Sequence, residues 1–382
     1  MYQILIKNGT VIDPQNGIHQ RADVAVAEGK IAEVGSLEED ATMVVDATGC
    51  IVTPGLIDHH AHLYPLAKIG IPAEAMCFSS GVTTAVDAGS TGCATFPSKL
   101  SAFENSKLTM KAYLNICSTG LDSLPVKLED VDPSHYDRGA VKEVFQEYGD
   151  RLLGLKLRTS REVVGELGYE PLRHIVELAG ELNVSVMVHC TNPPGKMDEL
   201  LSILRPGDIL THMYMNKGST ILDGDGKISR AALDARERDV VFEAADAREH
   251  FSFQVSEPAI AQGFLPDIIA TDLTKLSMNL RPTAFSMANQ LAKYQMLGIP
   301  LDKLIECCTS FPAKHMGLEG KAGCLTSGAW GDVAVFKPIQ CNDQFGDRPY
   351  FNPDCQLRTG TSRLRPVLTV KNGEAVFRDI EF

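Results

Sequence analysis

Apolar and polar residues alternate along both ends of the chain. Residues 3–13 alternate around Asn8-Gly9, and residues 23–35 do so around Glu28-Gly29-Lys30, which predicts two short hairpins with tight turns. Residues 367–377 repeat this pattern, including a Lys-Asn-Gly turn, and residues 332–336 resemble residues 23–26. We therefore expect one small β-sandwich domain built from both chain ends, with the remainder of the chain inserted into it.

The middle of the chain has a different pattern, in which short apolar runs alternate with segments of helical period. Residues 139–149 and 170–182 are typical of amphipathic helices. Strands are predicted at 51–57, 82–88, 109–117, 152–157, 184–189, 208–211, 239–243 and 267–271. Near-continuously apolar strands that alternate with helices favour a parallel sheet, and eight such units fit an α/β fold of the (β/α)₈ TIM-barrel type.

A doubly wound sheet is the alternative fold, but no G-x-G-x-x-G follows the first strand. The expected domains are a β-sandwich at 1–52 plus 322–382 and a barrel at 53–321.

Composition narrows the function classes. The chain has 382 residues, 44% of them apolar, which is enough for a large core. A net charge of −13 without a long Lys/Arg block disfavours nucleic acids and anionic membranes as partners. The ten cysteines form no C-x-x-C pair, which indicates free thiols in a reducing compartment. With no signal-peptide pattern and no long apolar segment, we expect a cytoplasmic protein.

The stretch "GLIDHHAHLY" at 55–64 is the first candidate for chemistry. On a strand, side chains two residues apart point to the same face, so His60 and His62 share a face and His59 takes the other. The pair lies at the C-terminal end of the first barrel strand, where barrel active sites are built. An H-x-H pair alone is weak evidence, because histidines at strand ends are often ordinary polar residues.

Further candidates recur at the ends of other predicted strands. His189 ends "VSVMVHC", His212 ends "GDILTHM" and Asp272 ends "PDIIATD". Lys156 lies inside the apolar strand "LLGLKLR", where burial of its charge requires a partner or a chemical modification. Because these ends meet at one face of a barrel, the sequence predicts a shared site.

The ordered set resembles the amidohydrolase superfamily. "PGLIDHHAH" at 54–62, the split β domain and the closing run "AGCLTSGAWGDVAVF" at 322–336 all carry this resemblance. It implies two divalent metal ions: His60, His62 and Asp272 on the more buried ion, His189 and His212 on the second, and Lys156, carboxylated by CO₂, bridging both.

The resemblance also implies the chemistry. Imidazole and carboxylate ligands suit zinc best, although iron, manganese or nickel fits the same set. Two such ions lower the pKa of a shared water toward about 7, which supplies metal-bound hydroxide. Asp272 would be the catalytic residue that accepts the water proton and returns it to the leaving group. The expected reaction is hydrolysis of an amide or ester.

Tyr64 separates this chain from one branch of the superfamily. Dihydroorotases typically carry H-x-H-x-R, and Tyr64 stands where that Arg would be. The chain looks most like a group of misannotated dihydroorotases that deacetylate N-acetyl or O-acetyl α-substituted carboxylates. Ring opening of a cyclic amide, as in dihydroorotase or hydantoinase, is the alternative. A non-catalytic scaffold of the same fold is disfavoured, because such proteins usually lose metal ligands.

Four residues are candidates to bind a small, carboxylate-bearing substrate. Arg158 lies two residues beyond Lys156 and could clamp a carboxylate, or form a surface salt bridge. Asn192, in "HCTNPPG", could orient the substrate or act as a turn residue before the two prolines. Tyr214 and Arg281 follow the sixth and eighth strands. A homo-oligomer is expected.

One loop departs from the resemblance. Many of these relatives carry a Gly-His-Gly-type loop after the seventh strand, and this chain has "FEAADAREHF" instead. Asp246 and His250 are the candidates to take over that function. Otherwise the pocket differs, and with it the substrate.

Overall fold

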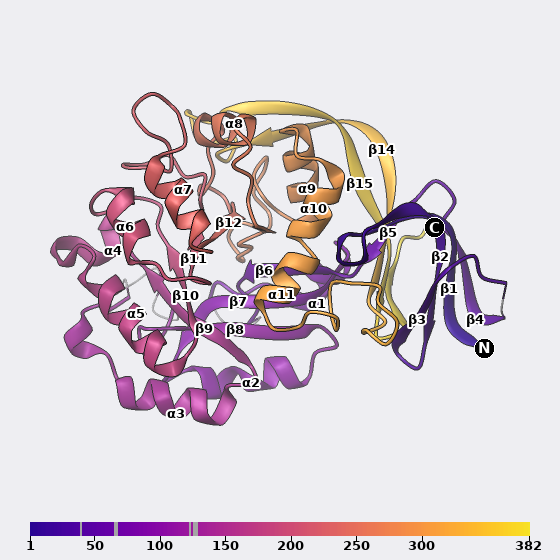
Figure 1. The fold of residues 1–382 in the computed structure, drawn as a ribbon, viewed down its shortest axis with the longest axis horizontal. Helices are drawn as coiled ribbons and strands as arrows, with labels where there is room; N and C mark the ends of the chain where they lie inside the picture. Colours follow the sequence, from indigo (N-terminus) through magenta and orange to yellow (C-terminus); the bar gives the residue numbers. More distant parts are fainter. Residues whose placement is uncertain (39, 65–67, 122–123, 125–128) are drawn as a thin grey trace.

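Eight parallel strands form a barrel in the computed structural model, which describes residues 1–382 except 39, 65–67, 122–123 and 125–128 (Figure 1). The chain order of the strands is also their spatial order. A bridge between Ala61 and Leu273 links the last strand to the first. The strands are β6 Leu56–Ala61, β7 Val82–Gly92, β8 Thr109–Asn115, β9 Leu152–Arg158, β10 Ser185–His189, β11 Ile209–Thr211, β12 Val241–Ala245 and β13 Ile268–Ala270. The predicted TIM-type barrel is confirmed.

Helices surround the barrel and cover its apolar strands. The two helices predicted from periodicity are present as α3 (Arg138–Tyr148) and α5 (Glu170–Leu182). The others are α1 Ala73–Phe78, α2 Phe96–Glu104, α4 Arg161–Val164, α6 Met197–Ile203, α7 Arg230–Glu237, α8 Phe253–Ala261, α9 Met287–Met296, α10 Leu301–Cys307 and α11 Ser310–His315. Among the helices that the structure describes, none has the length and apolar character to cross a membrane.

The strand predicted at 51–57 is two strands, so this prediction was wrong. β5 (Ile51–Pro54) pairs antiparallel with β14 in the terminal sheet, whereas β6 begins the barrel. Gly55 separates them, and a Cβ there would lie 2.2 Å from the Thr83 hydroxyl. Only glycine therefore fits where the chain passes from one sheet to the other.

Both ends of the chain contribute to a second, mixed sheet with its own apolar core, as expected (Figure 1). Its order is β16-β15-β14-β5-β1-β2-β3, and β4 pairs with the first half of β1, off this path. The strands besides β5 are β1 Tyr2–Asp13, β2 Ile18–Ala27, β3 Lys30–Gly35, β4 Ala41–Asp46, β14 Val333–Gly346, β15 Leu357–Lys371 and β16 Glu374–Arg378.

Two of the three predicted hairpins form. Glu28-Gly29 and Asn372-Gly373 have positive φ angles and turn β2 into β3 and β15 into β16. The hairpin expected at Asn8-Gly9 was wrong, because β1 runs through it with a bulge. Asn8 has φ 66°, and its N–H donates to Asp23 Oδ1 at 2.8 Å. Asn-Gly here makes a bulge on a strand that stays paired with β2 on both sides.

The long hairpin of β14 and β15 extends from the terminal sheet along the barrel (Figure 1). Arg358 of β15 forms a two-point ion pair with Glu257 of α8, with distances of 2.6 and 3.0 Å. A Cβ at Gly360 would lie 2.7 Å from Phe345 and 3.5 Å from Met296 of α9. The part of this hairpin between residues 337 and 366 was not predicted from the sequence.

Candidate metal centre

The six residues predicted as metal ligands come together at the C-terminal ends of five barrel strands. All six are nearly fully buried, with exposed fractions of 6% or less. Five of them line one pocket of about 160 Å³, and His212 lies against it through its contact with His189. The ligand residues and the strands that they end or follow are His60 and His62 (β6), Lys156 (β9), His189 (β10), His212 (β11) and Asp272 (β13).

Asp272 is the centre of the first group of side chains. Its Oδ1 lies 3.4 Å from His60 Nε2 and 3.2 Å from His62 Nε2. Lys156 Nζ lies 3.4 Å from the same His60 nitrogen. Potential ligand atoms of His60, His212 and Asp272 all lie within 4.8 Å of one another, a spacing that one metal ion can span.

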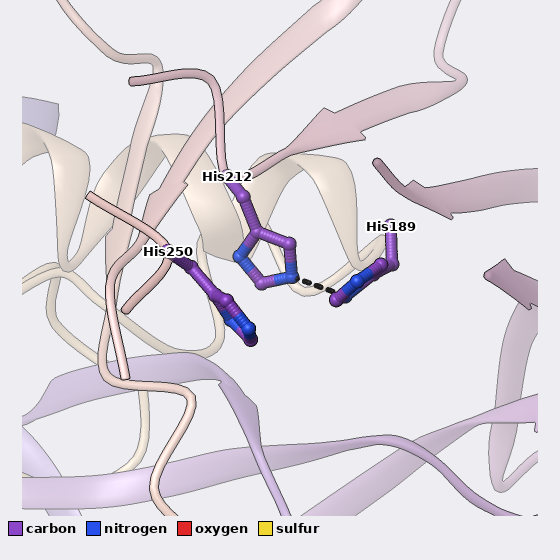
Figure 2. A group of neighbouring side chains, drawn as sticks. All are labelled: His189, His212 and His250. Carbon is purple, nitrogen blue, oxygen red and sulfur yellow. Dashed lines mark hydrogen bonds between the residues drawn. The ribbon is translucent and has the colours of Figure 1, made fainter. Parts of the chain in front are cut away.

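A second group is formed by three imidazoles. His189 Nδ1 lies 2.8 Å from His212 Nε2, and His250 stands beside both rings (Figure 2). One nitrogen of each of these three rings lies within 4.8 Å of the other two. The structure thus offers two adjacent groups of nitrogen and oxygen ligands, with His212 common to both.

Hydrogen bonds on the far side of the rings orient three of these histidines. His60 Nδ1 lies 2.7 Å from the Glu243 carboxylate, and His212 Nδ1 lies 2.6 Å from the carbonyl oxygen of Ala245. Both oxygens only accept, so Nδ1 carries the proton and Nε2 presents its lone pair to the centre. His62 Nδ1 pairs with Ser90 Oγ, which itself donates to Asp87. Such outer partners are typical of metal-bound imidazoles, so the residues fit a metal centre.

Burial lowers the pKa of three nitrogen bases of the site, whereas the carboxylates of Asp272 and Glu243 outweigh burial and raise the pKa of His60. Burial lowers the pKa of Lys156 to about 8, despite the opposing influence of Glu243 and Asp272. Burial, together with neighbouring cationic groups, also holds the pKa values of His189 and His212 well below their usual range. A neutral imidazole is the form that binds metal.

The two carboxylates of the site stay ionised although they are buried. Burial would raise the pKa of Asp272, but His60 and hydrogen bonds from His250, His60 and His62 hold it well below its usual range. Burial would also raise the pKa of Glu243, but His60 and His59 outweigh the effect of burial, so the pKa of Glu243 is lowered. Two buried anions beside the nitrogen bases create a field that favours cations.

Two of the predicted ligands have unusual backbone angles. His212 has φ 61° and Asp272 has φ 51°, in the left-handed region that non-glycine residues seldom occupy. The Asp272 N–H donates to the carbonyl oxygen of His60 at 2.6 Å, where the barrel closes. Such local strain is typical of functional sites, where it aims a side chain.

Of the four predicted substrate contacts, Arg158 is in the pocket. It lines the wall beside Lys156, and its Nη1 donates to the buried Glu129 at 2.6 Å. Asn192 is not among the lining residues, and its amide donates to Glu162 at 2.7 Å.

The structure does not bring Tyr214 or Arg281 to the pocket. Tyr214 is fully buried, and its hydroxyl donates to the Phe264 carbonyl oxygen at 3.1 Å. The Arg281 guanidinium stacks on Phe285 at 3.4 Å from the ring centre, in a different pocket beside α9, β14 and β15.

Three further residues belong to the site. Glu243 orients His59 and His60, and the signal for it was a charge inside the apolar run "VVFEAA". His250 donates through Nδ1 to Asp272 Oδ2 at 2.9 Å. Arg248, an exposed residue, lines the pocket. His250 was a candidate from the sequence, in the loop after the seventh barrel strand, whereas Arg248 was not. The metal roles of the six ligands stay predictions.

The chain is similar in sequence to proteins of the amidohydrolase family. Residues 243–376 match the amidohydrolase family. The chain is 34% identical to a deacetylase of Agrobacterium fabrum, over 90% of this chain and 86% of that protein. It is 30% identical to a deacetylase of Enterococcus faecalis, over 98% of each.

Solved structures share the whole fold. A crystal structure of an adenine deaminase has a TM-score of 0.88 at 27% identity, covering 99% of this chain and 100% of the other. One of a dihydroorotase has a TM-score of 0.86 at 30% identity, covering 98% and 99%. The barrel, the terminal sheet and these full-length relatives lead to one conclusion: the chain is a hydrolase that belongs to the amidohydrolase superfamily.

Proposed function

We propose that this hydrolase holds two divalent metal ions and that Lys156 is carboxylated. Zinc is the metal that best matches the imidazole and carboxylate ligands. A lysine with a pKa of about 8 is partly neutral at physiological pH, and only the neutral amine attacks CO₂. The new N–C bond forms with loss of one proton, and the product has two oxygens in place of a buried cation.

We further propose that the reaction is removal of an acetyl group from an N-acetyl or O-acetyl α-substituted carboxylate. When bound, the metal pair would ionise water and polarise the scissile carbonyl. Asp272 lines the pocket and contacts both His62 and His250, so its carboxylate can accept the proton of the attacking water. The same carboxyl then returns that proton to the departing amine or alcohol.

Arg158 is the proposed anchor for the substrate carboxylate. It lines the pocket two residues beyond Lys156, at the end of β9. One of its nitrogens is engaged by Glu129, and a guanidinium has further donors for a carboxylate. The exposed Arg248, which also lines the pocket, offers a second cation. If Arg158 is the anchor, Arg158→Met raises KM by about tenfold or more and Arg248→Met does so much less.

The observation that carries the proposal is the convergence of six buried candidate ligands, five of which line one pocket, in a chain whose full-length relatives are named deacetylases. The test is Asp272→Asn, assayed with acetylated α-hydroxy and α-amino acids. The variant should lose at least about 100-fold in kcat and still retain most of its metal. Wild-type rates in this variant would contradict the mechanism.

Cyclic amide hydrolysis is the second candidate, favoured by the dihydroorotase structure with which the chain shares 30% identity. It uses the same metal centre, so only substrates separate the two reactions. A panel of dihydropyrimidines and hydantoins, run beside acetyl esters and amides, decides between them. Higher kcat/KM for a ring substrate would replace deacetylation by ring opening.

The proposed location is the cytoplasm. All ten cysteines are free thiols, and eight of them are buried. Free thiols are typical of a reducing compartment.

A further inference from the structure

His250 is delivered to the metal centre by the loop that departs from the expected Gly-His-Gly pattern. Its ring centre lies 4.3 Å from that of His212 and 5.1 Å from that of His189 (Figure 2). The centres of His189 and His212 are themselves 4.5 Å apart. Three imidazoles bound to one tetrahedral ion have ring centres about 5 Å apart, so the three rings already have this spacing.

The loop that carries His250 is held from several sides. Asp246 forms a buried ion pair with Lys293 of α9 and accepts a hydrogen bond from Tyr294 at 2.9 Å. The N–H of Ala247 donates to the Thr271 carbonyl oxygen at 3.0 Å. The N–H of His250 donates to the backbone carbonyl oxygen of Asp246, also at 3.0 Å. These contacts hold the backbone of the loop and so fix the position of His250.

The hydrogen bond of His250 leaves one ring nitrogen available. A carboxylate only accepts, so Nδ1 carries the proton that it shares with Asp272, and Nε2 keeps its lone pair. His212 has the same arrangement, with Nδ1 on the Ala245 carbonyl oxygen. A ring held at one nitrogen by an oxygen acceptor, with the other nitrogen free, is the arrangement of a metal-bound histidine.

The geometry points to His250 as a third imidazole ligand of the second metal ion, beside His189 and His212. This inference rests on the proposed binuclear centre. It adds a ligand that the ordered set of six does not contain. It also links the two ions, because the histidine that binds the second ion donates a hydrogen bond to the carboxylate of the first.

The test measures metal affinity. Metal-stripped wild type, His250→Ala and His250→Gln are titrated with Co²⁺ against a chromophoric chelator, which gives stepwise constants for the two ions. Glu249→Ala, an exposed neighbour on the same loop, is the matched control. Both His250 variants should bind the second ion at least about tenfold more weakly, with the first ion little changed. X-ray absorption of the loaded proteins should show fewer imidazoles per cobalt in the variants.

The possible outcomes separate the two proposals. If wild type binds fewer than two ions, the binuclear centre itself fails. If wild type binds two ions and both His250 variants match it in each constant, only the role of His250 is overturned. Weakening confined to the first ion would also overturn it, since His250 would then act through Asp272 alone. Circular dichroism confirms that each variant is folded.

Discussion

At the scale of single residues, the site is a concentration of charges buried in the barrel. Lys156, Glu243 and Asp272 are each at most 4% exposed. A buried charge is costly unless it is paired or binds a metal. A metal pair would supply the positive charge that these carboxylates face.

Glu243→Gln tests the residue that orients His60. The change keeps the shape of the side chain and removes the charge that both His59 and His60 contact. We expect metal affinity to fall by about 10–100-fold, since such outer partners fix the ligand and raise its basicity. Chelator competition measures this, with Glu177→Gln on α5, 64% exposed, as control. Equal affinity in Glu243→Gln and wild type would contradict the role.

Lys156→Ala tests the bridging carboxylate. The variant should retain about one ion instead of two and lose on the order of 100-fold or more in rate. Elemental analysis and steady-state kinetics give both values. Added short-chain carboxylates should restore part of the activity, because they can fill the space that the lysine leaves. A variant with two ions and undiminished activity would show that Lys156 is no ligand.

Residues inside strands were easier to predict from sequence than residues in loops. Lys156 was conspicuous as a charge in an apolar run, and the strand period placed His60 and His62 on one face. Tyr214 was chosen only because it follows a strand, and the structure packs it into the core. The position of His250 depends on how the loop folds against α9, which no local pattern shows.

At the scale of elements, the loop after β12 depends on a buried ion pair between Asp246 and Lys293. The side chains are each 2% exposed, and Lys293 also lies 4.0 Å above the Phe251 ring. The pair joins the loop to α9 and so connects the packing of a helix with the position of His250.

Lys293→Met should therefore destabilise the fold. It leaves Asp246 as an unpaired buried charge, at an expected cost of about 3–5 kcal/mol in the free energy of unfolding. The double variant with Asp246→Asn should recover part of that loss. Lys142→Met removes a partner of Glu181 in an exposed pair and should cost about 1 kcal/mol or less. Denaturant unfolding compares them, and equal losses in Lys293→Met and Lys142→Met would contradict this account.

The sequence predicted the ends of strands correctly only where the turn residues formed the expected turn. Asn372-Gly373 gave the predicted turn, but Asn8-Gly9 has the same letters and forms a bulge, because both halves of β1 find partners on β2. The division of 51–57 at Gly55 was hidden, since both of its strands are apolar. Pairing across the fold decided these cases, and it is not encoded locally.

At the scale of the whole molecule, a second pair of histidines, the buried His59 and the half-buried His315, lies outside the six candidate ligands. The ring centre of His315 on α11 lies 5.4 Å from that of His59. Its Nε2 donates to the Gly207 carbonyl oxygen at 3.0 Å. Burial, and then the neighbouring His59, lower the pKa of His315 to about 4.

This low pKa predicts acid sensitivity. Above pH 6.5 His315 is neutral in both states and contributes nothing. As the pH falls from about 6.5 toward 4, the unfolded chain takes up a proton that the folded protein excludes, so stability falls. His315→Gln should remove on the order of 2 kcal/mol of the stability lost across that range. Thermal melts at several pH values, with the exposed His174→Gln as control, check this; an unchanged pH profile would contradict it.

We propose above that side chains from five strands hold two metal ions over one pocket. A crystal structure of the metal-loaded protein, with anomalous diffraction collected at the absorption edge of the metal, tests it directly. We expect two peaks, one among His60, His62 and Asp272 and the other beside His189 and His212, with density for a carboxylate on Lys156 reaching both. A single peak, peaks away from these side chains, or an unmodified Lys156 amine between two ions would contradict it.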